Sequence, residues 1–232
     1  MTSLRSAVAD ISEAGEGVLS VTTLQTFATQ WLAPRLGAFQ LAHPKIAVRL
    51  ETSSRVIDLL REDVDVAIRA GSGTWAEMEA VALFPSLMTA LCHPDVAAGL
   101  GDPPDPAALL DAPRIGLGSE WAAWFAATGV PPPVEEAQTA PRLVADAQVL
   151  EIAAAMAHRA VALASPVLFA AEIAAGRLVQ PFETTIAMGG GYWLVYPRDR
   201  RRARKIAAFR EWLLAQVAED PAAQRYLQAP AA

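Results

Sequence analysis

The amino-acid sequence predicts an α/β protein made of two α/β units, with the second inserted before the last helix of the first. About the first 70 residues show strand and helix patterns in the order β-α-β-α-β, which implies a parallel sheet with right-handed crossovers and helices on its faces. A middle block of shorter patterns follows, before a final amphipathic helix. Of the 232 residues, 53% are hydrophobic and 19% are charged, so the chain has enough apolar side chains for a core.

In the first unit, β-branched runs and alternating apolar residues indicate strands. The expected strands are Val18–Thr22, Ile46–Leu50 and Val64–Ile68. Apolar residues at helical spacing predict a helix over Thr26–His43, which Pro34 should weaken and Pro44 should end. A second helix is expected over Ser54–Glu62, with Ser54 as its N-cap.

The middle block and the end of the chain have shorter elements. The expected strands and apolar segments are Val81–Phe84, Leu87–Cys92, Ile115–Leu117, Val161–Ala164 and Tyr192–Tyr196. The expected helices are Trp121–Ala127, Arg142–His158, one that Pro166 opens and Gly176 caps, and Arg200–Val217. Between them, the proline-rich stretch Gly99–Pro113 is expected to be a loop with at most one helical turn.

Charge and cysteine content narrow the function classes. The net charge is −6, whereas a surface that binds duplex DNA is usually strongly basic. The single cysteine, Cys92, excludes an internal disulfide and suits a reducing compartment. We find neither a secretory signal nor an apolar run of roughly 18 residues. We therefore expect a cytoplasmic chain that does not bind membranes and, by itself, binds DNA poorly.

The sequence lacks the signatures of the common enzyme classes. Ser119 directly follows Gly118, so this segment is not a G-x-S-x-G nucleophile turn. The three histidines and one cysteine have no metal-ligand spacing. Gly189–Gly191 precedes a strand rather than a helix, so we expect a hairpin turn there and not a phosphate loop. We predict no catalytic residue, no metal site and no cofactor.

Six segments, in order, resemble the effector-binding domain of LysR-type transcriptional regulators, especially the subgroup typified by the glycine-cleavage activator. They are Phe27–Leu36 (FATQWLAPRL), His43-Pro44 with the strand after it, Val64–Arg69 (VDVAIR), Val161–Leu163 (VAL), Gly176–Val179 (GRLV) and Tyr192–Pro197 (YWLVYP). The resemblance implies two Rossmann-like lobes joined by two crossing strands, as in a type 2 periplasmic binding protein. The crossings would lie near Pro85–Leu87 and Leu194–Pro197.

The resemblance also implies the domain boundaries and the partners. Lobe I would comprise residues 17–87 and 195–228, and lobe II residues 88–194. Residues 1–16 would be the remnant of a linker helix. The winged helix-turn-helix of the family is absent, so we expect either a piece of a longer regulator or a naturally headless protein, and DNA contact only through the missing part. A small anion, amino acid or organic acid would bind between the lobes and shift the conformation of a homodimer or homotetramer. The first long helix would help to form this oligomer by packing against the second lobe of a neighbouring copy. The alternative function is a solute-binding protein of a transport system.

In such a fold the ligand lies at the carboxyl ends of the strands, where loops and helix N-termini present free N–H groups. The predicted ligand-binding residues are Thr23, Gln25, Thr26, Thr52, Ser53, Arg69, Gly71, Trp121, Gln148 and Ser165. Hydroxyls and a guanidinium suit an anionic group.

Several of these residues have another interpretation. Thr26 could simply cap its helix. Arg69 could pair with Asp65 or a glutamate instead of a ligand, and Trp121 could be a ligand platform or core packing. The family's G-x-G-V-A turn is replaced by His158–Ala162 here, so a close backbone approach is in doubt at that turn.

A basic run precedes and begins the last helix. Its members are Arg198, Arg200, Arg201, Arg202, Arg204 and Lys205. A nucleic-acid patch is one interpretation, but cations are unfavourable at a helix N-terminus and need compensation. We favour a solvated face that pairs with glutamates of a partner chain.

Overall fold

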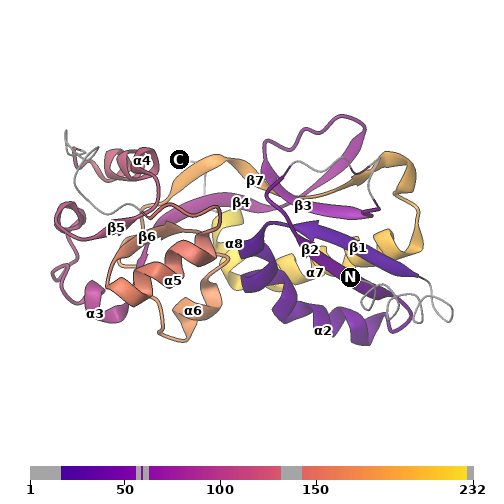
Figure 1. The fold of residues 1–232 in the computed structure, drawn as a ribbon, viewed down its shortest axis with the longest axis horizontal. Coiled ribbons are helices and arrows are strands. Elements are labelled where there is room, and N and C mark those ends of the chain that lie inside the picture. Colours follow the sequence, from indigo (N-terminus) through magenta and orange to yellow (C-terminus); the bar gives the residue numbers. More distant parts are fainter. Residues whose placement is uncertain (1–16, 56–58, 60–62, 132–142, 229–232) are drawn as a thin grey trace. The chain divides into compact units, whose positions relative to one another are not determined.

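The structure of the chain, a computed structural model, describes residues 17–55, 59, 63–131 and 143–228 (Figure 1). The chain divides into two compact units: unit 1 extends to Pro85 and resumes at Gly189, and unit 2 is Ser86–Met188. Both divisions fall within long strands, β4 (Met78–Cys92) and β7 (Ile186–Pro197). Two α/β units joined by two strands are the predicted fold class. The expected linker-helix remnant lies outside the described residues.

Unit 1 contains a mostly parallel sheet. Strand β1 (Val18–Thr23) pairs in parallel with β2 (Ala47–Thr52) and with β3 (Val66–Gly71), and β7 pairs antiparallel with β3. The strand order is β2-β1-β3-β7. The parallel arrangement expected from the β-α-β-α-β pattern is therefore confirmed. Most of the helix expected over Ser54–Glu62 lies outside the described residues.

The expected helix over Thr26–His43 has two parts. Phe27–Leu32 forms a π-helical segment, η1, and Ala33–Ala42 forms the α-helix α2. The wider turn is closed by the Ala33 N–H, which donates to the Ala28 carbonyl. Pro34 follows in the first turn of α2, where a missing N–H does no harm. The proline lies just after the junction between the two helix types, and the helix continues past it to Ala42.

The C-terminal helices complete unit 1. The short 3₁₀ turn η3 (Arg198–Arg200) leads to α7 (Arg204–Glu219), and α8 (Pro221–Leu227) follows. The buried face of α7 is the expected one; it consists of Ile206, Phe209, Leu213 and Val217. Phe39 of α2 packs edge-on against Phe209, with ring centroids 5.5 Å apart. The patterns did not predict α8.

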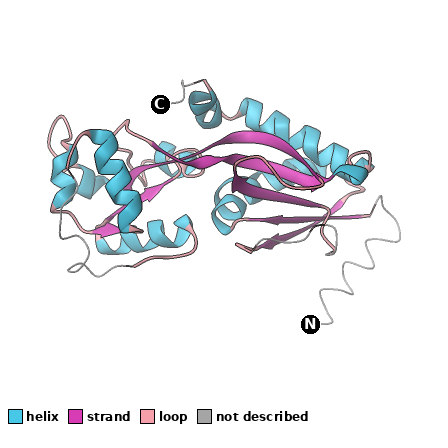
Figure 2. Ribbon diagram, turned by 90° about the horizontal axis from the view of Figure 1, so that it is seen from above, coloured by secondary structure: helices cyan, strands magenta, loops and turns pink. Residues whose placement is uncertain are grey.

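Unit 2 consists of short strands and helices (Figure 2). Its strands β5 (Arg114–Ile115) and β6 (Val161–Ala164) are parallel, and β4 pairs antiparallel with β6. Its helices are α3 (Pro94–Ala97), η2 (Pro106–Leu110), α4 (Gly118–Thr128), α5 (Gln148–His158) and α6 (Ala170–Ala174). The core includes Trp121, Trp124, Phe125 and Phe182.

Some expected boundaries are wrong. The two apolar segments on either side of Pro85 are one strand, β4. Helix α5 begins at Gln148, six residues later than expected, and α6 begins at Ala170 rather than at Pro166. Gly189–Gly191 lies inside β7 and is not a hairpin turn. Local patterns missed these boundaries because strand pairing and packing determine them.

Candidate functional site

The carboxyl ends of β1 and β2 lie side by side in unit 1. Thr23 is opposite Thr52 in the parallel register, and the Ser53 N–H donates to the Thr23 carbonyl over 2.9 Å. Thr52 is exposed, and the Ser53 hydroxyl accepts the Arg55 N–H at 3.1 Å. The sequence therefore predicted correctly that the loops after the first two strands meet.

The loop after β1 is less open than we expected. The Thr23 side chain is completely buried, and its hydroxyl has no hydrogen-bond partner among the described residues. Thr26 is also buried and forms no side-chain cap bond at the start of η1, so the capping interpretation is wrong. Only Gln25, of the three predicted residues here, is exposed. Thr23 is buried because it shares a strand face with the core residues Leu19 and Val21.

Arg69 on β3 reaches across to β1. Its guanidinium donates to the hydroxyl of Thr22 and to the Ile68 carbonyl, each at 3.0 Å. Arg69 forms no ion pair within the described part of the chain, and burial lowers the pKa of its guanidinium. The alternative pairing with Asp65 is wrong, because Asp65 binds Lys205 at 2.6 Å. Arg69 therefore retains N–H groups that can bind an anion.

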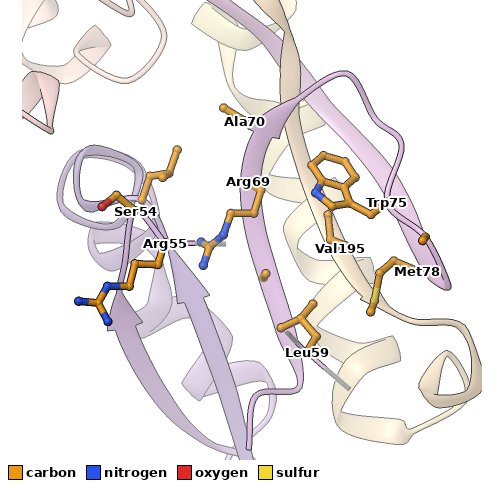
Figure 3. Close-up of a pocket in the computed structure, with 11 residues that line it drawn as sticks. Ser54, Arg55, Leu59, Arg69, Ala70, Trp75, Met78 and Val195 are labelled. Carbon is orange, nitrogen blue, oxygen red and sulfur yellow. The ribbon is translucent and has the colours of Figure 1, made fainter. Parts of the chain in front are cut away.

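A pocket of about 330 Å³ lies in unit 1 around Arg69 (Figure 3). Its lining includes Ser54, Arg55, Leu59, Arg69, Trp75 and Met78. Among these, the sequence analysis selected only Arg69. Trp75 follows the turn Gly71–Gly73 at the end of β3, and an aromatic residue after a glycine-rich turn was the available signal for it.

Gly71 was expected to lie close to a ligand. In the structure, residues of strand β7 come close to its backbone. Its carbonyl accepts the indole N–H of Trp193 at 2.9 Å. A Cβ atom on Gly190 would lie 2.0 Å from the same carbonyl oxygen. In the described structure, the missing side chain of Gly190 therefore serves the pairing of β3 with β7, whereas a Cβ atom on Gly71 would lie 3.1 Å from the ring of Trp75.

In unit 2, Gln148 and Ser165 are brought together. The side-chain oxygen of Gln148 accepts the Ser165 N–H at 3.0 Å, and the Ser165 hydroxyl accepts the Leu168 N–H at 3.3 Å. Gln148 opens α5 and Ser165 follows β6.

Trp121 is 2% exposed, and its indole N–H donates to the Ile115 carbonyl at 2.9 Å. Core packing accounts for Trp121.

Two carboxyl groups that the sequence analysis did not select lie beside the Gly116 loop. A Cβ atom on Gly116 would be 3.7 Å from both Glu151 carboxyl oxygens and 3.9 Å from one of Glu120. Burial raises the pKa of both carboxyl groups, and the charge of Glu120 raises that of Glu151 further. Glu151 also accepts the Ala145 N–H at 3.2 Å. The pair can accept hydrogen bonds from an ammonium or amide group.

The described residues contain no group of three or more histidine, cysteine or acidic side chains arranged to hold a metal ion. Among the described helices, none has both the length and the apolar character needed to span a bilayer.

Residues 12–218 match the family of the LysR substrate binding domain. The chain is 41% identical over 205 residues to the HTH-type transcriptional activator AmpR of Rhodobacter capsulatus, a match that covers 87% of this chain and 68% of that protein. It is 35% identical over 215 residues to the glycine cleavage system transcriptional activator of Escherichia coli K12, covering 90% and 68%. The chain thus spans about two thirds of the length of these relatives.

Solved structures give the same result. The effector domain of the transcriptional regulator AmpR of Pseudomonas aeruginosa superimposes with a TM-score of 0.76 at 38% identity, covering 91% of this chain and 99% of that one. For the AmpR effector binding domain from Citrobacter freundii the TM-score is 0.75 at 31% identity, with coverages of 87% and 98%. These relatives are transcriptional regulators, neither enzymes nor transport proteins. The chain therefore belongs to the LysR-type transcriptional regulators and is an effector-binding domain of that family.

Proposed function

We propose that this domain senses a small organic acid or amino acid through residues at the strand ends of unit 1. Arg69 carries the proposal. It is a partly buried guanidinium at the carboxyl end of a sheet, with no carboxylate partner among the described residues. A desolvated cation in that place is stabilised by an anionic ligand, and charge-assisted hydrogen bonds are about twice as strong as neutral ones. Thr52 and Ser53 border the same edge.

The edge of unit 2 supports an amino or amide group on the ligand. Glu120 and Glu151 offer hydrogen-bond acceptors beside Gly116, and Gln148 and Ser165 follow the neighbouring elements. The carboxyl groups of unit 2 suit a ligand with a hydrogen-bond donor, and Arg69 of unit 1 suits a ligand with a carboxylate. An amino acid or a short peptide has both groups.

Binding would act by changing the relative populations of conformations of an oligomer. A ligand that binds one conformation better shifts the equilibrium toward it. The relatives named as transcriptional activators support such a role in transcription, as a homodimer or homotetramer, with DNA bound by a part of the protein outside this chain. A cytoplasmic location is in keeping with the single cysteine, which is buried and unpaired.

A thermal-shift screen of amino acids, aromatic acids and other small anions tests this proposal. At least one compound should raise the melting temperature of the wild-type chain. For that compound, Arg69→Met should lower affinity by roughly tenfold or more, since a hydrogen bond to a charged group contributes about 1.5–3 kcal/mol. Thr52→Val should weaken binding to a lesser extent.

Arg177→Met is the matched control. Arg177 is an exposed arginine of unit 2, paired with Glu172 and remote in sequence from every predicted ligand residue. It should leave affinity unchanged. The proposal fails if no compound shifts the melting temperature, or if Arg69→Met and Thr52→Val bind the active compound as tightly as the wild type.

A further inference from the structure

The pocket in unit 1 is divided into a cationic side and an apolar side. Figure 3 shows Arg55 and Arg69 toward β1 and β2, while Trp75, Val195 and Met78 lie on the other side of β3. Because all five side chains line one pocket, a single ligand can contact both sides.

We propose that this pocket binds the apolar body of an organic carboxylate whose anionic group is held by Arg69 and Arg55. The inference rests on the proposed function and makes it more specific, because it names the ligand class: a carboxylate with a ring or a branched aliphatic group of similar size.

The cationic side has the chemistry for one carboxylate. Arg69 is fixed by its bonds to Thr22 and Ile68, so its remaining N–H groups are held in place before a ligand binds. Arg55 is exposed and can move toward a bound anion. A rigid guanidinium loses little freedom when it binds a carboxylate. Since Arg69 has no anionic partner among the described residues, a neutral occupant would leave it unpaired by them in a partly desolvated place, at a cost in binding energy.

The apolar side is already packed into the core. Leu59 and Val195 are 4% and 2% exposed and belong to a buried cluster, and Trp75 and Met78 pack against that cluster. The ring of Trp75 lies edge-on to that of Trp193, with centroids 6.4 Å apart, which restricts its orientation. A tryptophan face beside a methionine thioether suits an aromatic or branched aliphatic group.

The size of the pocket argues against a very small effector as its full occupant. A volume of about 330 Å³ lies within the range of ligand pockets, which is roughly 300–1,000 Å³. Acetate or glycine would leave the surfaces of Trp75 and Met78 uncovered. A ring of phenylalanine size fills this space and removes apolar area from water, which strengthens binding by about tenfold or more.

Calorimetric titration with three probes tests the inference. Phenylacetate carries both a ring and a carboxylate, acetate carries only the carboxylate, and benzyl alcohol carries only the ring. Phenylacetate should bind at least about tenfold more tightly than either of the other two, since 1.4 kcal/mol corresponds to a tenfold change in affinity. Equal affinities for phenylacetate and acetate would overturn the inference.

Two variants probe the apolar side. Trp75→Ala should weaken phenylacetate binding about tenfold while leaving acetate binding unchanged. Ala76→Phe introduces a ring at an exposed position of the pocket lining and should also weaken phenylacetate binding, because the added ring narrows the space. Ala126→Phe, at an exposed position of α4, is the matched control and should have no effect. Ala76→Phe leaves the inference testable if Trp75→Ala does not fold.

The outcomes separate this inference from the proposed function. If the screen finds an effector that needs Arg69 and Thr52, yet Trp75→Ala and Ala76→Phe bind it normally, the pocket inference fails and the proposed function stands. If phenylacetate binds and depends on Arg69 and Trp75, while no screened compound depends on Thr52, Gln148 or Ser165, then the pocket binds organic acids but these three residues are not part of the effector site.

Discussion

At the scale of single residues, Asp220 links three elements of unit 1 through one carboxylate. It accepts the indole N–H of Trp31 at 2.8 Å and the guanidinium of Arg35 at 2.9 Å. It also caps α8 by accepting the N–H groups of Ala222 and Ala223. The side chain is almost completely buried, so its removal would leave several donors unsatisfied.

We predict that Asp220→Ala lowers the free energy of unfolding by about 3 kcal/mol, because breaking a buried charge pair is strongly destabilising. Urea denaturation measures this change. Glu219→Ala removes the adjacent exposed carboxylate and should change stability by less than about 0.5 kcal/mol. Similar stabilities for the two variants would contradict the role of Asp220.

Cys92 should make stability depend on pH at the alkaline end. Burial raises the pKa of its thiol from 9.0 to about 11. The folded state therefore favours the neutral thiol, and this contribution is complete below pH 9 and is lost as the pH rises toward 11. The total loss amounts to about 2–3 kcal/mol, at 1.36 kcal/mol per pKa unit.

The test compares the unfolding free energy of the wild type with that of Cys92→Ala across this pH range. The wild type should lose stability more steeply than the variant, which has no thiol to ionise. Parallel pH profiles would show that the thiol titrates normally in the folded chain.

Residue-level chemistry was predictable only where strand position determined it. Arg69 was selected because it ends a strand in a parallel sheet, and its position in the structure fits that argument. Thr23 was selected on the same grounds, yet it is buried, because both faces of β1 are covered: its neighbour Thr22, on the opposite face, is 1% exposed. Lys205 was assigned to a solvated face; it binds Asp65 instead, which compensates its unfavourable place at the start of α7.

At the scale of elements, strand β7 depends on glycine at one position. Gly190 has a φ of +137°, and a Cβ there would lie 2.0 Å from the Gly71 carbonyl oxygen of β3. Gly189 has a φ of +75° and open space around it. These neighbouring glycines separate the effect of backbone conformation from that of a steric clash.

We predict that Gly190→Ala destabilises the chain by about 3 kcal/mol or more, because both strain and overpacking apply. Gly189→Ala should cost only about 1–2 kcal/mol, the penalty for a left-handed conformation. Chemical denaturation of both variants measures the difference. A larger loss for Gly189→Ala would contradict the close approach of β3 and β7.

Periodic patterns predicted the long elements of unit 1 better than the short ones of unit 2. Strands β1, β2 and β3 and the buried face of α7 follow directly from alternation and helical spacing. The extent of β4 could not be predicted, because Pro85 suggested a break that the long strand tolerates. The pocket beside Arg69 combines residues from five separate parts of unit 1. A single sequence does not show which distant segments come together, so the pocket could not be predicted from it.

At the scale of the whole molecule, an exposed leucine is the clearest candidate for self-association. Leu41 near the end of α2 is 86% exposed, and the first long helix was expected to contact a partner. We predict that Leu41→Glu weakens self-association, measured as the mass by light scattering over a range of concentrations. Ala38→Glu, at another exposed position of α2, is the matched control. It is preferred to Gln40→Glu because the Gln40 side chain donates to the Ile46 carbonyl. Unchanged masses for Leu41→Glu would exclude this surface.

The central claim is that a small organic acid binds at the strand ends of unit 1 through Arg69. Amide chemical-shift mapping of the isotope-labelled chain, titrated with a compound that raises its melting temperature, tests it most directly. The account predicts shifts around Thr52 and Arg69. Shifts confined to residues remote from these two would contradict it.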